Sequence, residues 1–215
     1  MGGCSRMSCE PSSWPELPAC LKPLLHAEEI AQLHQYAKLL QTWNERINLI
    51  SRRDIERVWE HHLIPSLLLL TWRRFPPGVR VLDIGTGGGL PGLPLAITHP
   101  ETEFLLLDST RKKVQAVAAM VAELGLSERC RVQWGRAETL RERFPFIVGR
   151  AVAPLPQVLR WVERLLEPQG TFYYYTGQPW PTPPSAWQAT WLPFREKMPE
   201  SPYLASKGIL ELRRP

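Results

Sequence analysis

The sequence predicts one α/β domain in which helices flank a mostly parallel β-sheet. Strand-like and helix-like segments alternate from about residue 79 to residue 175, and this rhythm is typical of parallel sheets. A glycine-rich turn follows the first strand of the series, at the point where α/β folds often bind ligands. The chain has 215 residues, which is enough for a single domain with a full core.

Two helices are expected ahead of the sheet. Residues 27–47 place apolar side chains at helical spacing. Asp54 is suited to cap a second helix from about residue 55 to 73, which Pro65 would kink or interrupt. Residues 1–26 are rich in proline and cysteine and lack periodicity, so they are interpreted as a loose N-terminal extension.

Apolar runs define the sheet and its crossover helices. The expected strands are 79–84, 103–108, 130–134, 145–149 and 170–175, and the expected helices are 91–98, 110–124 and 155–166. Two short strands in the proline-rich C-terminal region, at about 189–195 and 208–213, would form an antiparallel edge. The chain is thus divided into an N-terminal extension (1–26) and a single domain (27–215), composed of a helical cap (27–74), a core (75–177) and the antiparallel edge (178–215).

The turn after the first strand carries glycines at alternate positions, Gly85, Gly87 and Gly89. Because glycine has no Cβ, the backbone there can adopt positive φ angles and lie directly against a ligand. A dinucleotide fingerprint requires a small residue where Leu90 stands, and a P-loop requires a Gly-Lys-Ser/Thr sequence that is absent. The spacing from Asp83 through the glycines instead resembles motif I of class I S-adenosylmethionine-dependent methyltransferases. A turn without a ligand is the competing interpretation, but its glycines would lower stability without improving packing.

A second element of a nucleoside site is Asp108, which ends the next strand 23 residues after Gly85. An acid at this place binds the ribose hydroxyls of adenosine cofactors, because a carboxylate accepts two hydrogen bonds. Asp108 is also suited to cap the helix that begins near Thr110, a role that Ser109 or Thr110 itself could fill. The two interpretations are compatible.

Two further side chains follow strands that end at the same edge of the sheet. Glu138, beside Ala137, could bind an adenine amino group while a neighbouring backbone N–H faces a ring nitrogen. Arg150 could bind a carboxylate or phosphate through two parallel hydrogen bonds. An ordinary surface acid and a surface ion pair are the alternatives for these two residues.

The net charge of +5 is unevenly distributed along the chain. Residues 108–215 carry 16 basic and 10 acidic side chains, whereas residues 1–107 carry 10 and 11. Basic surface beside a nucleoside site suggests a polyanionic partner such as nucleic acid, although charges scattered over a solvated face explain the excess equally well.

The remaining composition limits the class of protein. The hydrophobic content of 44% is that of a soluble globular protein, and no apolar run approaches the roughly 20 residues of a membrane span. The cysteines show neither metal-ligand nor dense disulfide spacing, so we expect free thiols, no metal site and a reducing cytoplasm. These cysteines are Cys4, Cys9, Cys20 and Cys130.

With these residues in place, the chain resembles the bacterial 16S ribosomal RNA guanine-N7 methyltransferases, also called glucose-inhibited division protein B. The similarity extends over roughly residues 27–177. The similar segments are Trp43–Leu49, His62 with Ser66-Leu67, Asp83–Pro94, Asp108–Lys113, Gly135–Glu138, and Arg150-Ala151 with Gly170.

The resemblance implies a Rossmann-like class I methyltransferase fold, with a seven-stranded, mostly parallel sheet behind an N-terminal helical cap. It implies S-adenosylmethionine as cofactor and small-subunit ribosomal RNA as partner, bound by the basic face of residues 108–215. The implied cofactor-binding residues are Gly85, Gly87, Gly89, Leu90, Asp108, Ser109, Thr110, Ala137, Glu138 and Arg150. Pro65 and Thr176 depart from the family's usual Asp and Lys, and Gly149 from its usual Ser or Ala.

The expected reaction needs no catalytic base, because guanine N7 carries a lone pair and no proton. Positioning N7 against the methyl group can therefore supply most of the catalysis, and we assign no catalytic residue. N7 lies in the deep major groove of A-form RNA, so the target guanine should be unpaired. One of Tyr173–Tyr175 could stack on it, although sheet packing is the better interpretation for at least two.

A protein that binds S-adenosylmethionine and docks on RNA without catalysis is the alternative function, and Leu90 disfavours an NAD-linked enzyme. We expect a monomer in the cytoplasm that has no membrane association.

Overall fold

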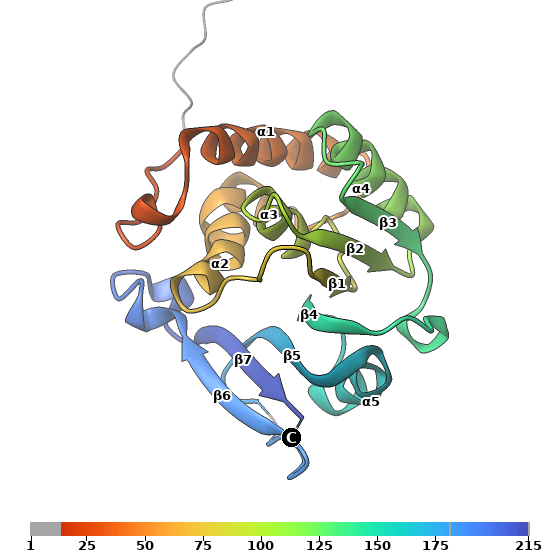
Figure 1. Cartoon of the computed structure of the whole chain (residues 1–215). Coiled ribbons are helices and arrows are strands. Elements are labelled where there is room, and N and C mark those ends of the chain that lie inside the picture. Colours follow the sequence, from red (N-terminus) through yellow and green to blue (C-terminus); the bar gives the residue numbers. More distant parts are fainter. Residues whose placement is uncertain (1–13, 181, 215) are drawn as a thin grey trace, which may run out of the picture.

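The protein is built around one seven-stranded sheet (Figure 1). The computed structural model describes residues 14–180 and 182–214. The strand order is β3-β2-β1-β4-β5-β7-β6, and all neighbouring pairs from β3 to β5 are parallel. The strands are β1 (Arg80–Ile84), β2 (Glu103–Asp108), β3 (Cys130–Trp134), β4 (Phe144–Arg150), β5 (Leu166–Gly177), β6 (Gln188–Pro193) and β7 (Lys207–Arg213). The expected mostly parallel, seven-stranded α/β fold is therefore confirmed.

The C-terminal strands form the antiparallel part of this sheet. β7 inserts between β5 and β6 and runs antiparallel to both. Gly177 at the end of β5 pairs with Lys207 at the start of β7. This pairing brings the beginning of β7 to the carboxyl end of the parallel strands, where a ligand is expected.

Helices cover the two faces of the sheet unequally (Figure 1). α1, α3 and α4 contribute to one large apolar core with the residues between 55 and 71. The opposite core is covered by α5, assisted by tryptophans from the C-terminal region. The bounds of the helices are α1 (Ala27–Asn44), α2 (Ile64–Leu67), α3 (Gly92–Ile97), α4 (Arg111–Glu123) and α5 (Leu155–Leu165). Alternation along the buried strands divides their side chains between the cores, as Leu82 and Leu105 face the α5 side while Val81 and Phe104 face the other.

The second predicted helix, from about 55 to 73, is confirmed as a run of helical residues from 55 to 71, and its irregularity lies at Pro65 as expected. The run is not a regular α-helix. It consists of a 3-10 turn (Ile55–Arg57), a π-helical turn (Trp59–Leu63), α2, and a 3-10 turn (Leu68–Thr71). The π-helical turn lies directly before Pro65, and the Ile64 N–H bonds to the Trp59 carbonyl five residues back. Because proline has no N–H, a regular α-helix cannot bond through this position. The expected cap is wrong, since within the described residues the Asp54 side chain caps no backbone group and binds His61 instead.

The described part of the N-terminal extension packs against the domain. Leu21 is fully buried, Leu25 is nearly so, and Trp14 lies against the rings of His34 and Trp59. The expected free thiols at Cys4 and Cys9 lie outside the described residues, and among the described ones Cys20 and Cys130 form no disulfide. Within the described ranges, no helix combines the length and apolar character that crossing a bilayer requires.

The winding of the sheet reverses between β1 and β4. From β1 the chain proceeds through α3, β2 and α4 to β3 at one side, whereas β4 continues on the other side of β1. Loops that leave β1 and β4 therefore diverge at the carboxyl ends of the strands and leave a crevice there.

Candidate cofactor and substrate site

A hollow of about 650 Å³ opens at the carboxyl ends of the parallel strands. The turn after β1 and the start of the segment after β2 form one end of it. The loop after α1, the π-helical turn and the start of β7 form the rest. The residues used below that line it are Leu49, Ile50, Asp54, His61, His62, Pro65, Gly85, Thr86, Gly87, Gly88, Leu90, Asp108, Ser109, Thr110, Lys113, Arg150, Val152, Tyr175, Thr176, Gly177, Phe194, Tyr203 and Lys207.

The glycine turn presents bare backbone to this hollow. Gly85 and Gly87 have φ angles of 68° and 58°, in the left-handed region that side chains other than glycine rarely adopt. A Cβ on Gly87 would meet no atom closer than 4.0 Å, so the space above this backbone is open. A Cβ on Gly85 would lie 2.7 Å from the Val152 side chain. The turn can therefore receive a ligand against its backbone, and a side chain at either glycine would intrude.

The helical cap braces the turn from the other side. The Tyr36 hydroxyl, which is fully buried on α1, donates a hydrogen bond of 2.9 Å to the Gly88 carbonyl. The Asn44 side chain at the end of α1 accepts hydrogen bonds from the N–H groups of Leu49 and Ile50. These bonds hold the loop after α1 over the glycines, so the cap forms one wall of the site.

Asp108 lies between the turn and the next helix. One carboxylate oxygen accepts the Gly87 N–H at 2.9 Å, and the other accepts the Thr110 N–H at 2.7 Å. Because a carboxylate oxygen can accept more than one hydrogen bond, both oxygens keep capacity for two hydroxyl donors. Thr110, rather than Asp108, is the N-cap residue of α4, and its side chain makes no capping hydrogen bond.

Asp83 is completely buried beneath the turn and holds it to α3. Its Oδ2 accepts hydrogen bonds from the Thr86 hydroxyl at 2.6 Å and from the Gly92 N–H at 2.9 Å. A Cβ on Gly92 would lie 2.5 Å from the same oxygen, so only glycine allows this approach. The other carboxyl oxygen, Oδ1, has no hydrogen-bond partner in the part of the chain that the structure describes, and burial raises the pKa of Asp83 to about 7 despite the two hydrogen bonds.

A smaller hollow of about 170 Å³ adjoins the first on the far side of Val152. Gly85, Asp108, Ser109 and Val152 line both hollows, so the two communicate along the turn. Residues that follow β3 close the smaller one, including buried Ala137 and exposed Glu138. An elongated nucleoside can thus be expected to extend past Asp108 from one hollow to the other.

Arg150 lines the main hollow at the end of β4. It is only partly exposed, and burial lowers the pKa of its guanidinium. In the described chain no carboxylate lies within ion-pair distance of it, so the predicted alternative of a surface ion pair is not observed. The preceding Gly149 is explained by packing, because a Cβ there would lie 2.8 Å from the Ile84 side chain.

The structure thus gathers most of the predicted site residues around the two hollows, with one difference. Gly89 lines neither hollow, since it turns the chain into α3, and a Cβ on it would lie 2.6 Å from Leu93. Gly88 lines the main hollow in its place. The three tyrosines of β5 are buried; Tyr175 alone lines the hollow, and its hydroxyl donates to the Ser66 carbonyl.

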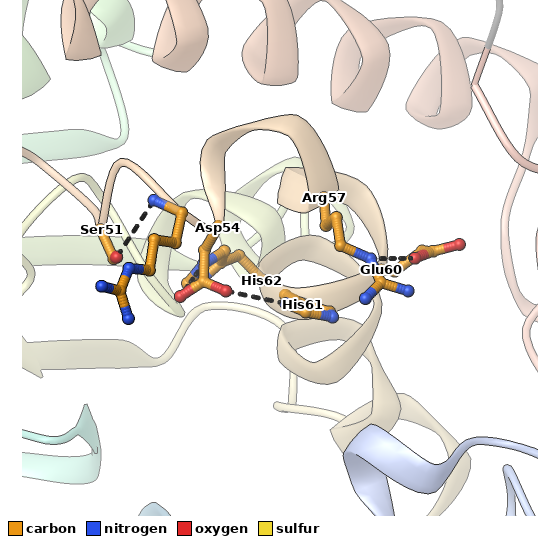
Figure 2. A network of polar contacts seen from close by, with 7 residues as sticks. Ser51, Asp54, Arg57, Glu60, His61 and His62 are labelled. Carbon is orange, nitrogen blue, oxygen red and sulfur yellow. Dashed lines mark hydrogen bonds and ion pairs between the residues drawn. The ribbon is translucent and has the colours of Figure 1, made fainter.

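The sequence does not indicate that a further cluster of polar side chains lines the hollow. Its members lie in four places along the chain: Asp54 before the first 3-10 turn, His61 and His62 in the π-helical turn, Tyr203 in a 3-10 turn (Pro202–Leu204), and Lys207 at the start of β7. Figure 2 shows the Asp54 carboxylate directed at His61, whose Nδ1 lies 2.9 Å from Oδ1. The His61 ring stacks on Tyr203 with centroids 3.5 Å apart, and the Lys207 ammonium lies 3.0 Å from the Tyr203 centroid. The pairing of β7 with β5 brings Tyr203 and Lys207 to the hollow, and no local sequence pattern predicts that pairing.

The family comparison agrees with this architecture. A family model described as "GidB: rRNA small subunit methyltransferase G" matches residues 29–182. Curated proteins named "Ribosomal RNA small subunit methyltransferase G" are similar in sequence. The one from Chlorobium limicola is 48% identical over 64% of this chain and 63% of its own length. The one from Chlorobaculum tepidum is 46% identical over 67% of each chain. The matched region thus spans about two thirds of these relatives.

Solved structures share the fold at much lower sequence identity. The [4+2]-cyclase SpnF matches with a TM-score of 0.55 and 17% identity, over 87% of this chain and 96% of that one. TrmN from Thermus thermophilus matches with a TM-score of 0.51 and 21% identity, over 71% of this chain and 48% of that one. Because one of these proteins is a cyclase, the shared fold does not by itself specify the reaction.

Proposed function

The chain belongs to the GidB family of ribosomal RNA small subunit methyltransferase G, and from this membership we propose that it methylates N7 of a guanine in 16S ribosomal RNA, with S-adenosylmethionine as methyl donor. The single observation that carries the proposal is the bare glycine turn beside Asp108, at the carboxyl end of β1. The sequence of the turn favours this function over the binding of a nucleotide phosphate by a P-loop, because no Gly-Lys-Ser/Thr sequence follows the glycines.

The residues present fit an adenosine cofactor with an amino-acid tail. Gly87 would receive it on open backbone next to Gly85, and the Asp108 oxygens would accept its ribose hydroxyls. Ala137 and Glu138 line the smaller hollow, which suits an adenine, whereas Arg150 in the main hollow suits a carboxylate. We extend the assignment to Leu90, Ser109 and Thr110, which line the main hollow, and to Gly89 only as support for the turn.

The bound cofactor would supply an electrophilic methyl group on a positively charged sulfur. The protein need not remove a proton, because guanine N7 is already a free nucleophile. Its residues therefore act by holding the base and by excluding water from a concave site. The positive charge that develops on the guanine is favoured by the carboxylates of Asp54 and Asp108 at the hollow.

The substrate class follows from the family name and from the basic residues that border the hollow. Lys113, Arg150 and Lys207 line it, and the exposed residues Arg111 and Lys112 begin the adjoining helix α4. This arrangement suits a phosphate backbone. We further propose that the protein acts as a monomer in the cytoplasm, without membrane association.

The test is methyl transfer to unmodified 16S RNA, either free or assembled into small subunits. Incubation with radiolabelled S-adenosylmethionine should yield 7-methylguanine, located by mass spectrometry of nuclease fragments. Asp108→Asn should weaken cofactor binding about tenfold or more in calorimetry, because hydrogen bonds to a charged group are lost. Glu123→Gln on exposed α4 surface is the matched control and should bind like the wild type.

A non-catalytic protein that binds S-adenosylmethionine and RNA is the second candidate. Pro65 and Thr176, which stand where the family usually has Asp and Lys, both line the hollow. Tight binding of cofactor and RNA without any 7-methylguanine would favour this candidate. Absence of cofactor binding would remove both candidates.

A further inference from the structure

We propose that Asp54 is the residue that recognises guanine, by accepting hydrogen bonds from the N1–H and the N2 amino group of an unpaired base. This inference rests on the proposed function, and it identifies the base-reading part of the same site. The observation behind it is a carboxylate that lines the hollow, is about one-third exposed, and is anchored by a hydrogen bond on one oxygen only.

The position of Asp54 suits the shape of a guanine that offers N7 to the methyl donor. In guanine, N7 and the N1–H/N2 donors lie on opposite edges of the ring system. A base whose N7 faces the cofactor end therefore directs these donors away from it. Within the described residues, the polar contacts of the Asp54 side chain are to His61 and His62, whereas the carboxylate beside the glycine turn is that of Asp108. Asp54 therefore lies on the wall of the hollow that carries the two histidines.

The chemistry of Asp54 selects guanine over adenine. An ionised carboxylate only accepts hydrogen bonds, and guanine presents two adjacent donors on this edge. Adenine places an acceptor at N1, which a carboxylate repels. The hydrogen bond from His61 holds the pKa of Asp54 below its usual range, so the carboxylate is ionised at neutral pH. Its Oδ2 lies 4.0 Å from His62 Nε2, too far for a hydrogen bond, and is left for a ligand.

The surroundings of Asp54 fix its orientation. His61 is held by the π-helical turn on one side and by its stack on Tyr203 on the other, with ring planes 4° apart. Both His61 and His62 are about nine-tenths buried, and three of their four ring nitrogens have no hydrogen-bond partner in residues 14–180 and 182–214. His61 is therefore a positioning residue, because its ring makes a single hydrogen bond and that bond holds the Asp54 carboxylate.

Nucleotide binding to the wild-type protein tests the proposal without requiring catalysis. The protein, saturated with S-adenosylhomocysteine, is titrated with guanosine, inosine and adenosine monophosphates and followed by saturation-transfer NMR. We expect guanosine monophosphate to bind about tenfold more tightly than inosine monophosphate, which lacks the N2 amino group, and adenosine monophosphate to bind weakest. Equal affinity for the three nucleotides, or no binding of the guanine nucleotide, overturns the proposal.

Asp54→Asn supplies the second test, because asparagine keeps the shape but turns one acceptor into a donor. The variant should lose the preference for guanosine over inosine monophosphate and about tenfold in kcat/KM on 16S RNA, at unchanged cofactor affinity. Glu60→Gln, at an exposed position of the π-helical turn that carries His61, should keep the preference for guanosine monophosphate and the kcat/KM of the wild type. A variant that retains the preference overturns the proposal. Absence of methyl transfer by the wild type contradicts the proposed function instead, and the nucleotide titration still decides the role of Asp54.

Discussion

At the scale of single residues, the site depends on positions where only glycine fits. Gly85 has a φ angle of 68°, and its missing side chain leaves room for the Val152 side chain, which lines the hollow and would lie 2.7 Å from a Cβ. Gly78 has a similar φ angle of 75° at the turn before β1, with no atom within 4 Å of where a Cβ would be. The two glycines therefore separate backbone strain from the displacement of a side chain that lines the site.

Gly85→Ala should weaken the binding of S-adenosylmethionine at least tenfold, because the new methyl group displaces Val152 and narrows the turn. Gly78→Ala should cost a similar strain energy of roughly 1–2 kcal/mol in stability but leave the dissociation constant within about twofold. Calorimetric titration of both variants, with urea unfolding alongside, measures the difference. Equal cofactor affinity in the two variants would contradict the role given to the turn.

Asp83 predicts a particular dependence of stability on pH. The pKa of its carboxyl rises from 3.8 to about 7 on burial, so the folded state binds this proton more strongly than the unfolded chain. Stability from this group is therefore full below about pH 4 and is lost as the pH rises through about 7. The total loss is of the order of 2–4 kcal/mol.

The measurement compares the wild type with Asp83→Asn, which stays neutral at every pH. Thermal unfolding at pH 5 and pH 8 should show a larger loss of stability in the wild type than in the variant. The comparison between variants cancels the titration of other buried groups such as His99, whose pKa burial lowers to about 4. Parallel curves would show that Asp83 remains ionised throughout.

At the scale of elements, the π-helical turn at Trp59–Leu63 shows how one residue redirects a helix. The sequence predicts a helix that Pro65 kinks or interrupts, and the structure shows a helical run whose hydrogen bonding changes before Pro65, which lacks an N–H. The resulting turn brings two consecutive histidines, His61 and His62, to the same hollow. The π-helical turn therefore contributes residues to the functional site, in addition to interrupting the second helix of the N-terminal cap.

Helix α5 has the most direct consequence for stability, because it is the α-helix that covers the second core. Leu159 is 3% exposed there, whereas its neighbour Arg160 is exposed. Leu159→Ala should destabilise the fold by about 2–5 kcal/mol through the cavity it leaves. Arg160→Ala should change stability by less than about 0.5 kcal/mol. Urea unfolding of both variants measures the change in the free energy of unfolding. Equal losses of stability in the two variants would mean that α5 packs weakly on the sheet.

At the scale of the whole molecule, the fold brings together basic residues that the sequence distributes unevenly along the chain. Basic residues from α4, β4 and β7 meet at one hollow although they are far apart in the chain, as Lys113, Arg150 and Lys207 show. A phosphate backbone that approaches the site would meet these cations together.

Lys113→Ala should weaken binding to 16S RNA and reduce the slope of log K against log salt concentration by roughly one, because one phosphate contact is lost. Cofactor affinity should remain unchanged. Lys22→Ala removes an exposed lysine that pairs with Glu16 outside the hollow and serves as control. Filter-binding titrations between 50 and 200 mM salt, roughly the range over which such contacts are resolved, provide the slopes. An unchanged slope for Lys113→Ala would place the RNA elsewhere.

The sequence by itself determined the α/β fold, the order of most elements and the half of the site that lies near the glycine turn. Strand and helix periodicity are local signals, and so is the spacing from Gly85 to Asp108. A βα turn forms from neighbouring residues, so its chemistry can be inferred before the fold is known. The ends of the neighbouring strands also pointed to Ala137, Glu138 and Arg150, and the family resemblance then implied that these residues bind the cofactor.

Only the tertiary structure decided how the other end of the hollow is built. Asp54 was expected as a helix cap, and nothing in the proline-rich C-terminal segment indicated that Tyr203 and Lys207 would face it. Their meeting depends on β7 inserting between β5 and β6, a pairing between residues distant in the chain. Such contacts are selected by burial over the whole sheet, and a local pattern of side chains does not encode them.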